Sequence, residues 1–107
     1  MNIEERTYDL APGHLPAYIA LVQEAGIATP RPILGRLIGY FHTELGLLNQ
    51  ILYLRAYQSF QVRAERRARL AAYPRWKEYA AKVHGFSLRQ QNRILLPMSF
   101  SGLGGVR

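Results

Sequence analysis

The residues of this chain that could do chemistry begin within its first ten positions. Residues 3–10 alternate in character and are followed by a Pro-Gly pair at 12–13, which is typical of a strand that ends in a turn. Because side chains alternate along a strand, Glu4, Arg6 and Tyr8 share one face. Two interpretations are open. Glu4 and Arg6 form an ion pair with a purely structural role, or they form the floor of a pocket for an acidic or carbonyl ligand.

Two further predicted strands, at 36–43 and 49–57, add aromatic and titratable side chains to the same face. Their connection is short, so they should form an antiparallel hairpin. Aromatic walls with a few polar groups are typical of small-molecule sites, but tyrosines also fill subunit interfaces, and both interpretations stay open. His42 is the candidate general acid or base because an imidazole titrates near neutral pH; the alternative is a structural or exposed side chain. The residues placed on this face are Arg36, Ile38, Tyr40, His42, Tyr53, Arg55 and Tyr57.

A predicted helix at 59–72 carries a run of arginines. Arg63 and Arg67 flank its small-residue face, where they extend along the helix edge, reach a carboxylate of the chain such as Glu44, or bind an anion. Zinc sites need several nitrogen or sulfur ligands, whereas the chain has no cysteine and three histidines without ligand-spaced partners. We therefore expect no metal ion and no cofactor.

Length and composition restrict the class of protein. The chain has 107 residues, a formal net charge of +7 and 49% hydrophobic residues. These values predict one folded domain over 1–107, with 99–107 as a flexible or partner-docked tail. The arginines are spread along the chain, so a nucleic-acid partner is disfavoured. Glu4, Glu5, Arg6 and Asp9 are charged residues that a secretory signal would not carry, and no apolar run could span a bilayer. We therefore expect a cytoplasmic protein without a membrane partner.

The remaining segments complete a βαββαβ order. The apolar stripe from Leu15 to Val22 predicts a first helix, which should end at Gly26 in a left-handed conformation. A helix is predicted at 74–83 and a last strand at 87–95. The helices should cover one face of a four-stranded antiparallel sheet, which is an α+β architecture.

The second face of this sheet also needs a cover. The strand at 49–57 is apolar or aromatic on both faces, whereas a solvated face would alternate with polar residues. A second copy of the sheet is the simplest cover. This predicts a homodimeric α/β barrel in which Glu4, Arg6 and Tyr8 point into a cavity between two sheets.

Several stretches match one family in order and spacing. They are EERTYDLAPG at 4–13, GRLIGYF at 35–41 with Thr43-Glu44, Leu48-Asn49 and Tyr57, the arginines at 63, 66 and 67 followed by PRW at 74–76, and QNRIL at 91–95. From Ile3 to about Phe100 the chain resembles the NIPSNAP family, although Tyr53 and Arg55 stand where the family often has His and Trp. The resemblance implies a ferredoxin-like fold, a homodimeric α/β barrel and no firmly established activity.

Three functions are weighed on these grounds. The leading hypothesis is a homodimer that binds a small organic or acidic molecule in its cavity. The alternative is a cofactor-independent monooxygenase or isomerase, because such enzymes use similar dimeric barrels, an argument from fold alone. An RNA-binding module shares the βαββαβ order, but the strand at 49–57 lacks the aromatic signature that such a module needs.

Overall fold

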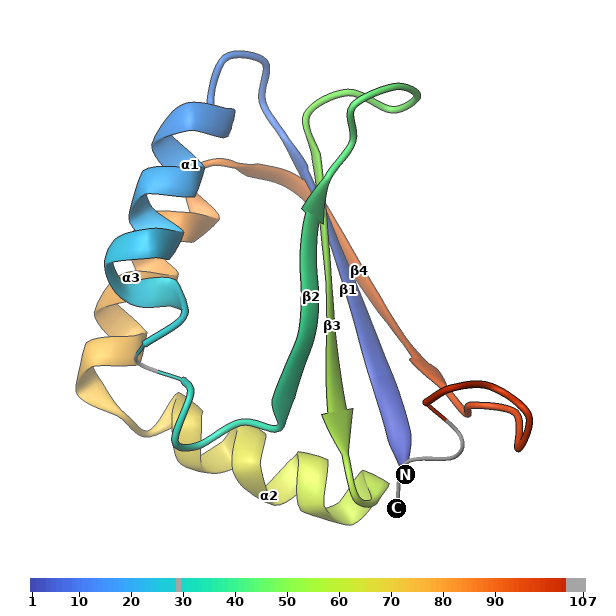
Figure 1. Cartoon of the computed structure of the whole chain (residues 1–107). Helices are drawn as coiled ribbons and strands as arrows, with labels where there is room; N and C mark the ends of the chain where they lie inside the picture. Colours follow the sequence, from blue (N-terminus) through green and yellow to red (C-terminus); the bar gives the residue numbers. More distant parts are fainter. Residues whose placement is uncertain (29, 104–107) are drawn as a thin grey trace.

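The computed structural model describes residues 1–28 and 30–103. In this part of the chain four strands form one antiparallel sheet in the order β2-β3-β1-β4, and the α-helices lie together on one side of it (Figure 1). The predicted α+β, ferredoxin-like βαββαβ architecture is confirmed. The elements are β1 (Asn2–Leu10), α1 (Leu15–Leu21), a π-helical turn η1 (Val22–Gly26), β2 (Arg36–His42), β3 (Gln50–Tyr57), α2 (Phe60–Ala71), α3 (Pro74–His84) and β4 (Ser87–Leu95).

Local sequence accounts for where the helices begin. The Ser59 hydroxyl accepts a hydrogen bond of 3.0 Å from the Val62 backbone N–H and caps α2. Proline stands in the first turn of α1 and begins α3, where its missing N–H has no helical partner to lose. No helix in the described residues is long and apolar enough to cross a membrane.

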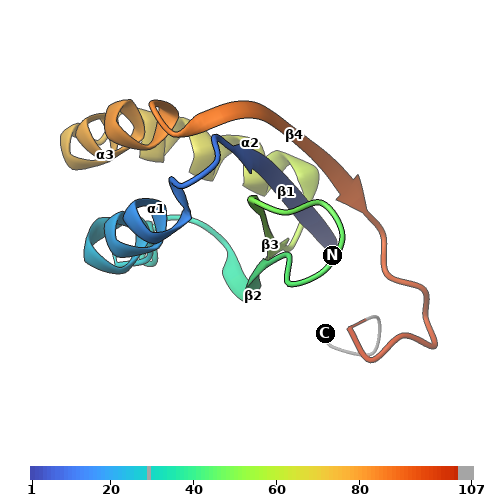
Figure 2. The ribbon, with the colours of Figure 1, turned by 90° about the horizontal axis from the view of Figure 1, so that it is seen from above.

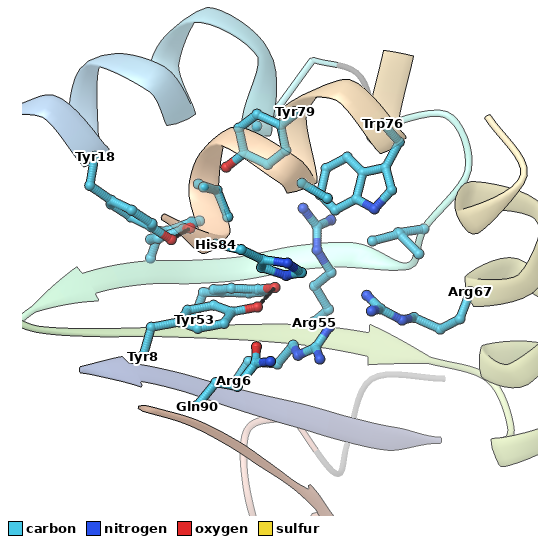
Figure 3. Close-up of a pocket in the computed structure, with 15 residues that line it drawn as sticks. Arg6, Tyr8, Tyr18, Tyr53, Arg55, Arg67, Trp76, Tyr79, His84 and Gln90 are labelled. Carbon is cyan, nitrogen blue, oxygen red and sulfur yellow. Dashed lines mark hydrogen bonds between the residues drawn. The ribbon is translucent and has the colours of Figure 1, made fainter. Parts of the chain in front are cut away.

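The core lies between the sheet and the helices, and it is unusually rich in tyrosine. In the sheet, Arg6 lies opposite Tyr53, and Tyr53 lies opposite Tyr40. Their side chains point toward α1 and α3, which contribute Tyr18 and Tyr79 to the same layer (Figure 3). The predicted helix stripes therefore cover the tyrosine-bearing face of the sheet.

The predicted orientation of this face is wrong. Arg6 and Tyr8, with their neighbours on β2 and β3, point toward the chain's own helices and not into a space between two sheets. Glu4 points the same way, because its carboxylate is hydrogen-bonded to Arg63 of α2. The physical reason is that both faces of β3 are apolar enough to be covered. Tyr18 and Tyr79 on the helices pack against the tyrosines of the sheet. Leu52 and Leu54 lie on the opposite face, which the helices do not cover.

A bulge in β2 corrects a second prediction. The pairing register shifts between Leu37 and Gly39, so that Leu37 lies opposite Arg55 while Arg36 lies opposite Ala56. Ile38 is the extra residue that a bulge inserts. Arg36 and Ile38 therefore do not continue the face of Tyr40, as strict alternation predicted.

The outer side of the sheet has no helix over it in the described residues (Figure 2). It carries Leu52 and Leu54, together with Phe41, which is 54% exposed. Beyond β4, the chain continues through 96–103 without a further strand and displays exposed apolar side chains. Residues 104–107 of the predicted tail lie outside the described residues.

Gly26 is required for close packing and not for a left-handed helix end. Positive φ angles occur at Gly13 and Gly46, whereas Gly26 is not among such residues. A Cβ at position 26 would overlap the Tyr79 hydroxyl and lie 2.8 Å from Tyr79 Cζ. The glycine thus lets η1 approach α3 directly above the tyrosine layer.

We expect Gly26→Ala to lower the free energy of unfolding by about 1–3 kcal/mol, because the added methyl group overpacks against Tyr79. The urea midpoint measures this change. Gly85→Ala is the matched control, because φ there is −64° and the nearest atom would be 3.4 Å away; its change should stay within about 0.5 kcal/mol. Equal midpoints for the two variants would contradict the close approach.

Candidate functional site

A cavity of about 280 Å³ lies between the sheet and the helices (Figure 3). Side chains from all four strands and from α1, α2 and α3 line it, so the complete fold is needed to build it. η1 contributes Gly26 to its wall, and π-helical turns of this kind are frequent at functional sites. The polar and aromatic lining residues are Arg6, Tyr8, Tyr18, Tyr40, Tyr53, Arg55, Arg67, Trp76, Tyr79, His84 and Gln90.

Tyrosine hydroxyls occupy one side of the cavity (Figure 3). The Tyr18 and Tyr40 hydroxyls are hydrogen-bonded at 2.6 Å, and those of Tyr8 and Tyr53 at 3.3 Å. Burial raises the pKa of Tyr18 to about 12 and also raises the pKa of Tyr8, Tyr40 and Tyr79. These four hydroxyls therefore stay neutral at physiological pH and can donate hydrogen bonds.

Arginine side chains occupy the other side. Arg6 comes from β1, Arg55 from β3 and Arg67 from α2, and their guanidinium groups converge on the cavity (Figure 3). Arg55 is 4% exposed; its Nη1 donates to the Gly35 carbonyl at 3.0 Å, while its buried Nε has no partner in the described residues. None of the described residues that line the cavity is Asp or Glu.

The carboxylate of Glu4 lies next to the cavity but is already bound. Its Oε2 accepts hydrogen bonds from Arg63 Nη2 at 2.6 Å and Asn92 Nδ2 at 2.9 Å, and it lies 3.9 Å from Arg6 Nε. Burial alone would raise the pKa of Glu4, but the Arg63 and Asn92 hydrogen bonds and the charge of Arg6 outweigh it and lower the pKa. Glu4 is thus ionised at neutral pH, and Arg63 holds an anion that belongs to this chain.

The structure divides the residues proposed from the sequence into two groups. Arg6, Tyr8, Tyr40, Tyr53, Arg55 and Arg67 line the cavity. Outside it, Glu4 and Tyr57 are buried, and Arg63 is bonded to Glu4. His42 is exposed at the end of β2 and borders a different hollow beside Tyr18 and Phe41.

Sequence reasoning missed the side chains that the helices contribute to the cavity. Tyr18, Trp76 and Tyr79 lie on apolar helix stripes, a pattern that predicts packing against the sheet rather than a polar site. Their polar tips at core positions were the signal that could have revealed a polar cavity. His84 comes from the last turn of α3, and its imidazole points between the tyrosine and arginine sides (Figure 3). In residues 1–28 and 30–103 no three His, Asp or Glu side chains are grouped to hold a metal ion.

The family model described as NIPSNAP matches residues 3–102. The chain belongs to the NIPSNAP family. A NIPSNAP family protein of unknown function from Agrobacterium tumefaciens is 43% identical, with a TM-score of 0.93 over 96% of this chain and 93% of that chain. A NIPSNAP-like domain protein from Burkholderia xenovorans is 50% identical, with a TM-score of 0.90 over 94% of this chain and 87% of that chain. The resemblance seen in the sequence is thus confirmed.

More distant structures share the fold alone. A putative antibiotic biosynthesis monooxygenase from Nitrosomonas europaea has a TM-score of 0.69 over 92% of this chain and 99% of that chain, but only 8% identity. No curated protein matches the sequence. The function of this NIPSNAP protein must therefore be argued from its own cavity.

We expect Glu4→Gln to lower the free energy of unfolding by about 3–5 kcal/mol at pH 7, because Arg63 and Arg6 lose their buried carboxylate. A carboxyl with a lowered pKa stabilises the fold above its ordinary value of 4.5, and this contribution is lost as the pH falls through the folded-state pKa. The difference between wild type and variant should therefore shrink on acidification below 4.5.

Urea unfolding at neutral and acidic pH measures both effects. Glu65→Gln is the control, because Glu65 is exposed on α2 and makes only a long hydrogen bond to Gln61; its change should stay within about 0.5 kcal/mol. A Glu4→Gln deficit that is the same at both pH values would contradict the ionised, arginine-bound state of Glu4.

Proposed function

We propose that this NIPSNAP protein binds a small organic molecule in the cavity between its sheet and its helices. The observation that carries the proposal is the lining itself, because protein cores are normally filled by closely packed aliphatic side chains. Here about 280 Å³ is bordered by tyrosine hydroxyls, arginines and Trp76. Sites for small ligands are concave and aromatic with a few polar groups, and begin at about 300 Å³, so a ligand with a single ring fits this size.

We also propose that the protein is a homodimer in which a second copy covers the outer face of the sheet. The support is the apolar side chains of the outer face, where Phe41 is 54% exposed and Leu52 and Leu54 are half-buried. Met98 and Phe100, in the segment after β4, are 61% and 85% exposed. Exposed apolar side chains gathered on one surface mark interaction sites, and two such sheets can pack face to face about a two-fold axis. Each copy would keep its own cavity on the opposite side. A cytoplasmic location remains part of this proposal.

A catalytic role is the second candidate, and His84 favours it. An imidazole can accept a proton from a bound phenol or from a carbon next to a carbonyl group, and neutral tyrosine hydroxyls can stabilise the oxyanion that forms. This step is common to cofactor-independent monooxygenases and isomerases. Turnover of a bound compound, measured beside its binding, decides between the two functions.

We expect Ala80→Phe to abolish ligand binding, because Ala80 lines the cavity and a benzyl group there would fill it. Trp76 is the chain's single tryptophan and also lines the cavity, so its fluorescence reports occupancy. The measurement is a fluorescence titration with short phenolic and β-keto acids. Ala81→Phe is the matched control, since Ala81 is exposed on the same helix. Equal binding by both variants would place the ligand elsewhere.

We expect Leu52→Glu to convert the dimer into a monomer, because a carboxylate would be buried without a partner in the interface between the sheets. Sedimentation equilibrium at micromolar concentration should give twice the 12.2 kDa chain mass for the wild type and the chain mass for the variant. Ile19→Glu serves as the control, because Ile19 is 37% exposed on α1, on the helix side of the sheet. A monomeric wild type would overturn the dimer.

A further inference from the structure

The cavity has two chemically different ends, and this polarity restricts what it can bind. Arg67 stands at one end and the Tyr8 and Tyr53 hydroxyls stand at the other, while Arg55 lies between them with its Cζ 5.9 Å from the centroid of the Tyr53 ring (Figure 3). In the described residues, neither Arg55 nor Arg67 has a carboxylate within 4.0 Å, and the nearby Glu4 is bound by Arg63 and Asn92. The arginine end therefore carries positive charge that no carboxylate of the described residues neutralises.

Burial makes this uncompensated charge costly. Arg55 is 4% exposed and its Nε lies buried without a hydrogen-bond partner in the described part of the chain. Unpaired buried charge destabilises a fold unless an anion compensates it. Arginine pairs with planar anions through two parallel hydrogen bonds, so the Arg55–Arg67 end is complementary to a carboxylate.

The positive surface extends beyond the cavity. A second hollow on the other side of Arg55 is lined by Arg31 and Arg36, and no Asp or Glu is among its described lining residues. Clefts lined by charge of one sign raise the local concentration of the opposite ion. Anions are thus favoured over neutral or cationic molecules before they reach the cavity.

Aromatic layers above and below restrict the remainder of the ligand. The Tyr40 and Tyr53 rings stack on the sheet with centroids 4.7 Å apart, and the Trp76 and Tyr79 rings lie on the helix side, 4.9 Å apart. Aromatic faces stack favourably on a flat ring, so these side chains favour an aromatic ligand. The Tyr8–Tyr53 hydrogen bond is long, at 3.3 Å, so these hydroxyls have hydrogen-bonding capacity left for a ligand oxygen.

We propose that the ligand is an aromatic carboxylate with an oxygen at the far end of its ring. Its carboxylate is held by Arg55 and Arg67, its ring lies against the aromatic side chains of the cavity, and its distal hydroxyl or carbonyl group is hydrogen-bonded by the Tyr8 hydroxyl. A carboxylate is favoured over a phosphate because it lies in the plane of the ring. This inference rests on the proposed function and narrows it to one class of compound.

The test uses the purified full chain and Trp76 fluorescence titrations with four probes: 4-hydroxybenzoate, 4-hydroxybenzamide, benzoate and phenyl phosphate. We expect 4-hydroxybenzoate to bind most tightly. The amide, which has the same shape without the charge, should bind about 10–100-fold more weakly, as hydrogen bonds to a charged group predict. Benzoate, which lacks the distal oxygen, should bind several-fold more weakly than 4-hydroxybenzoate.

Variants on α2 locate the anion within the cavity. Arg67→Met should weaken 4-hydroxybenzoate binding about 10–100-fold and leave binding of the amide nearly unchanged. Arg69→Met is the matched control, because Arg69 is exposed on the same helix and does not line the cavity; it should bind as the wild type does. Arg67 is half-buried, and the thermal midpoint of the variant verifies that it folds.

The outcomes separate this inference from the proposed function. If the acid and the amide bound equally and Ala80→Phe abolished both, the preference for a carboxylate would be wrong. The proposal that the cavity binds a small molecule would still hold. Tighter binding of phenyl phosphate would overturn the carboxylate in favour of a phosphate. Failure of all four probes to bind at millimolar concentration would overturn the inference and also remove support from the proposed function.

Discussion

The structure depends on finding hydrogen-bond partners for the hydroxyl, guanidinium and carboxylate groups that are buried between the sheet and the helices. Four strands and their helices enclose a layer made largely of tyrosine and arginine. Each buried polar group there costs stability unless it finds a partner. Glu4 is matched by Arg63, Asn92 and Arg6, and the Tyr18 hydroxyl by that of Tyr40. Atoms that stay without a partner in the described residues include Arg55 Nε, which belongs to a cavity-lining residue, together with Glu4 Oε1 and the Tyr57 hydroxyl.

The two faces of the sheet consequently differ in chemical character. The inner face carries the polar aromatic side chains and, with η1 packed closely on α3, encloses the cavity. The outer face carries aliphatic side chains and the Glu5–Arg93 pair, whose Nε–Oε1 distance is 2.8 Å. The ligand binding and the association between copies that we propose would therefore change independently, because they use residues on opposite faces of the sheet.

Much of this fold could be predicted from local pattern. The bounds of the elements follow from alternation, helix stripes, Ser59 and Pro74, each of which acts within a few residues. The inner cluster of Arg6, Tyr8 and Tyr53 was also recognised, because period-two alternation groups residues without any tertiary information. The family followed from motifs whose spacing is local.

What could not be predicted depends on contacts between distant residues. Alternation in β3 separates two faces but does not say which one the helices cover. The β2 bulge changes the face of Arg36 without a strong local signal. Arg63 lies 59 positions from Glu4, and no local pattern pairs them. His84 follows the last apolar residue of a helix stripe, and only the packing of α3 shows that its side chain lines the cavity. His42, the histidine proposed from the sequence, borders a different hollow.

A crystal structure of the protein with 4-hydroxybenzoate tests the central claim most directly. The account predicts electron density for one molecule between the sheet and the helices of each chain, with the carboxylate within hydrogen-bonding distance of Arg55 and the ring beside Trp76. Density on the outer face, between the sheets of two chains, would contradict it.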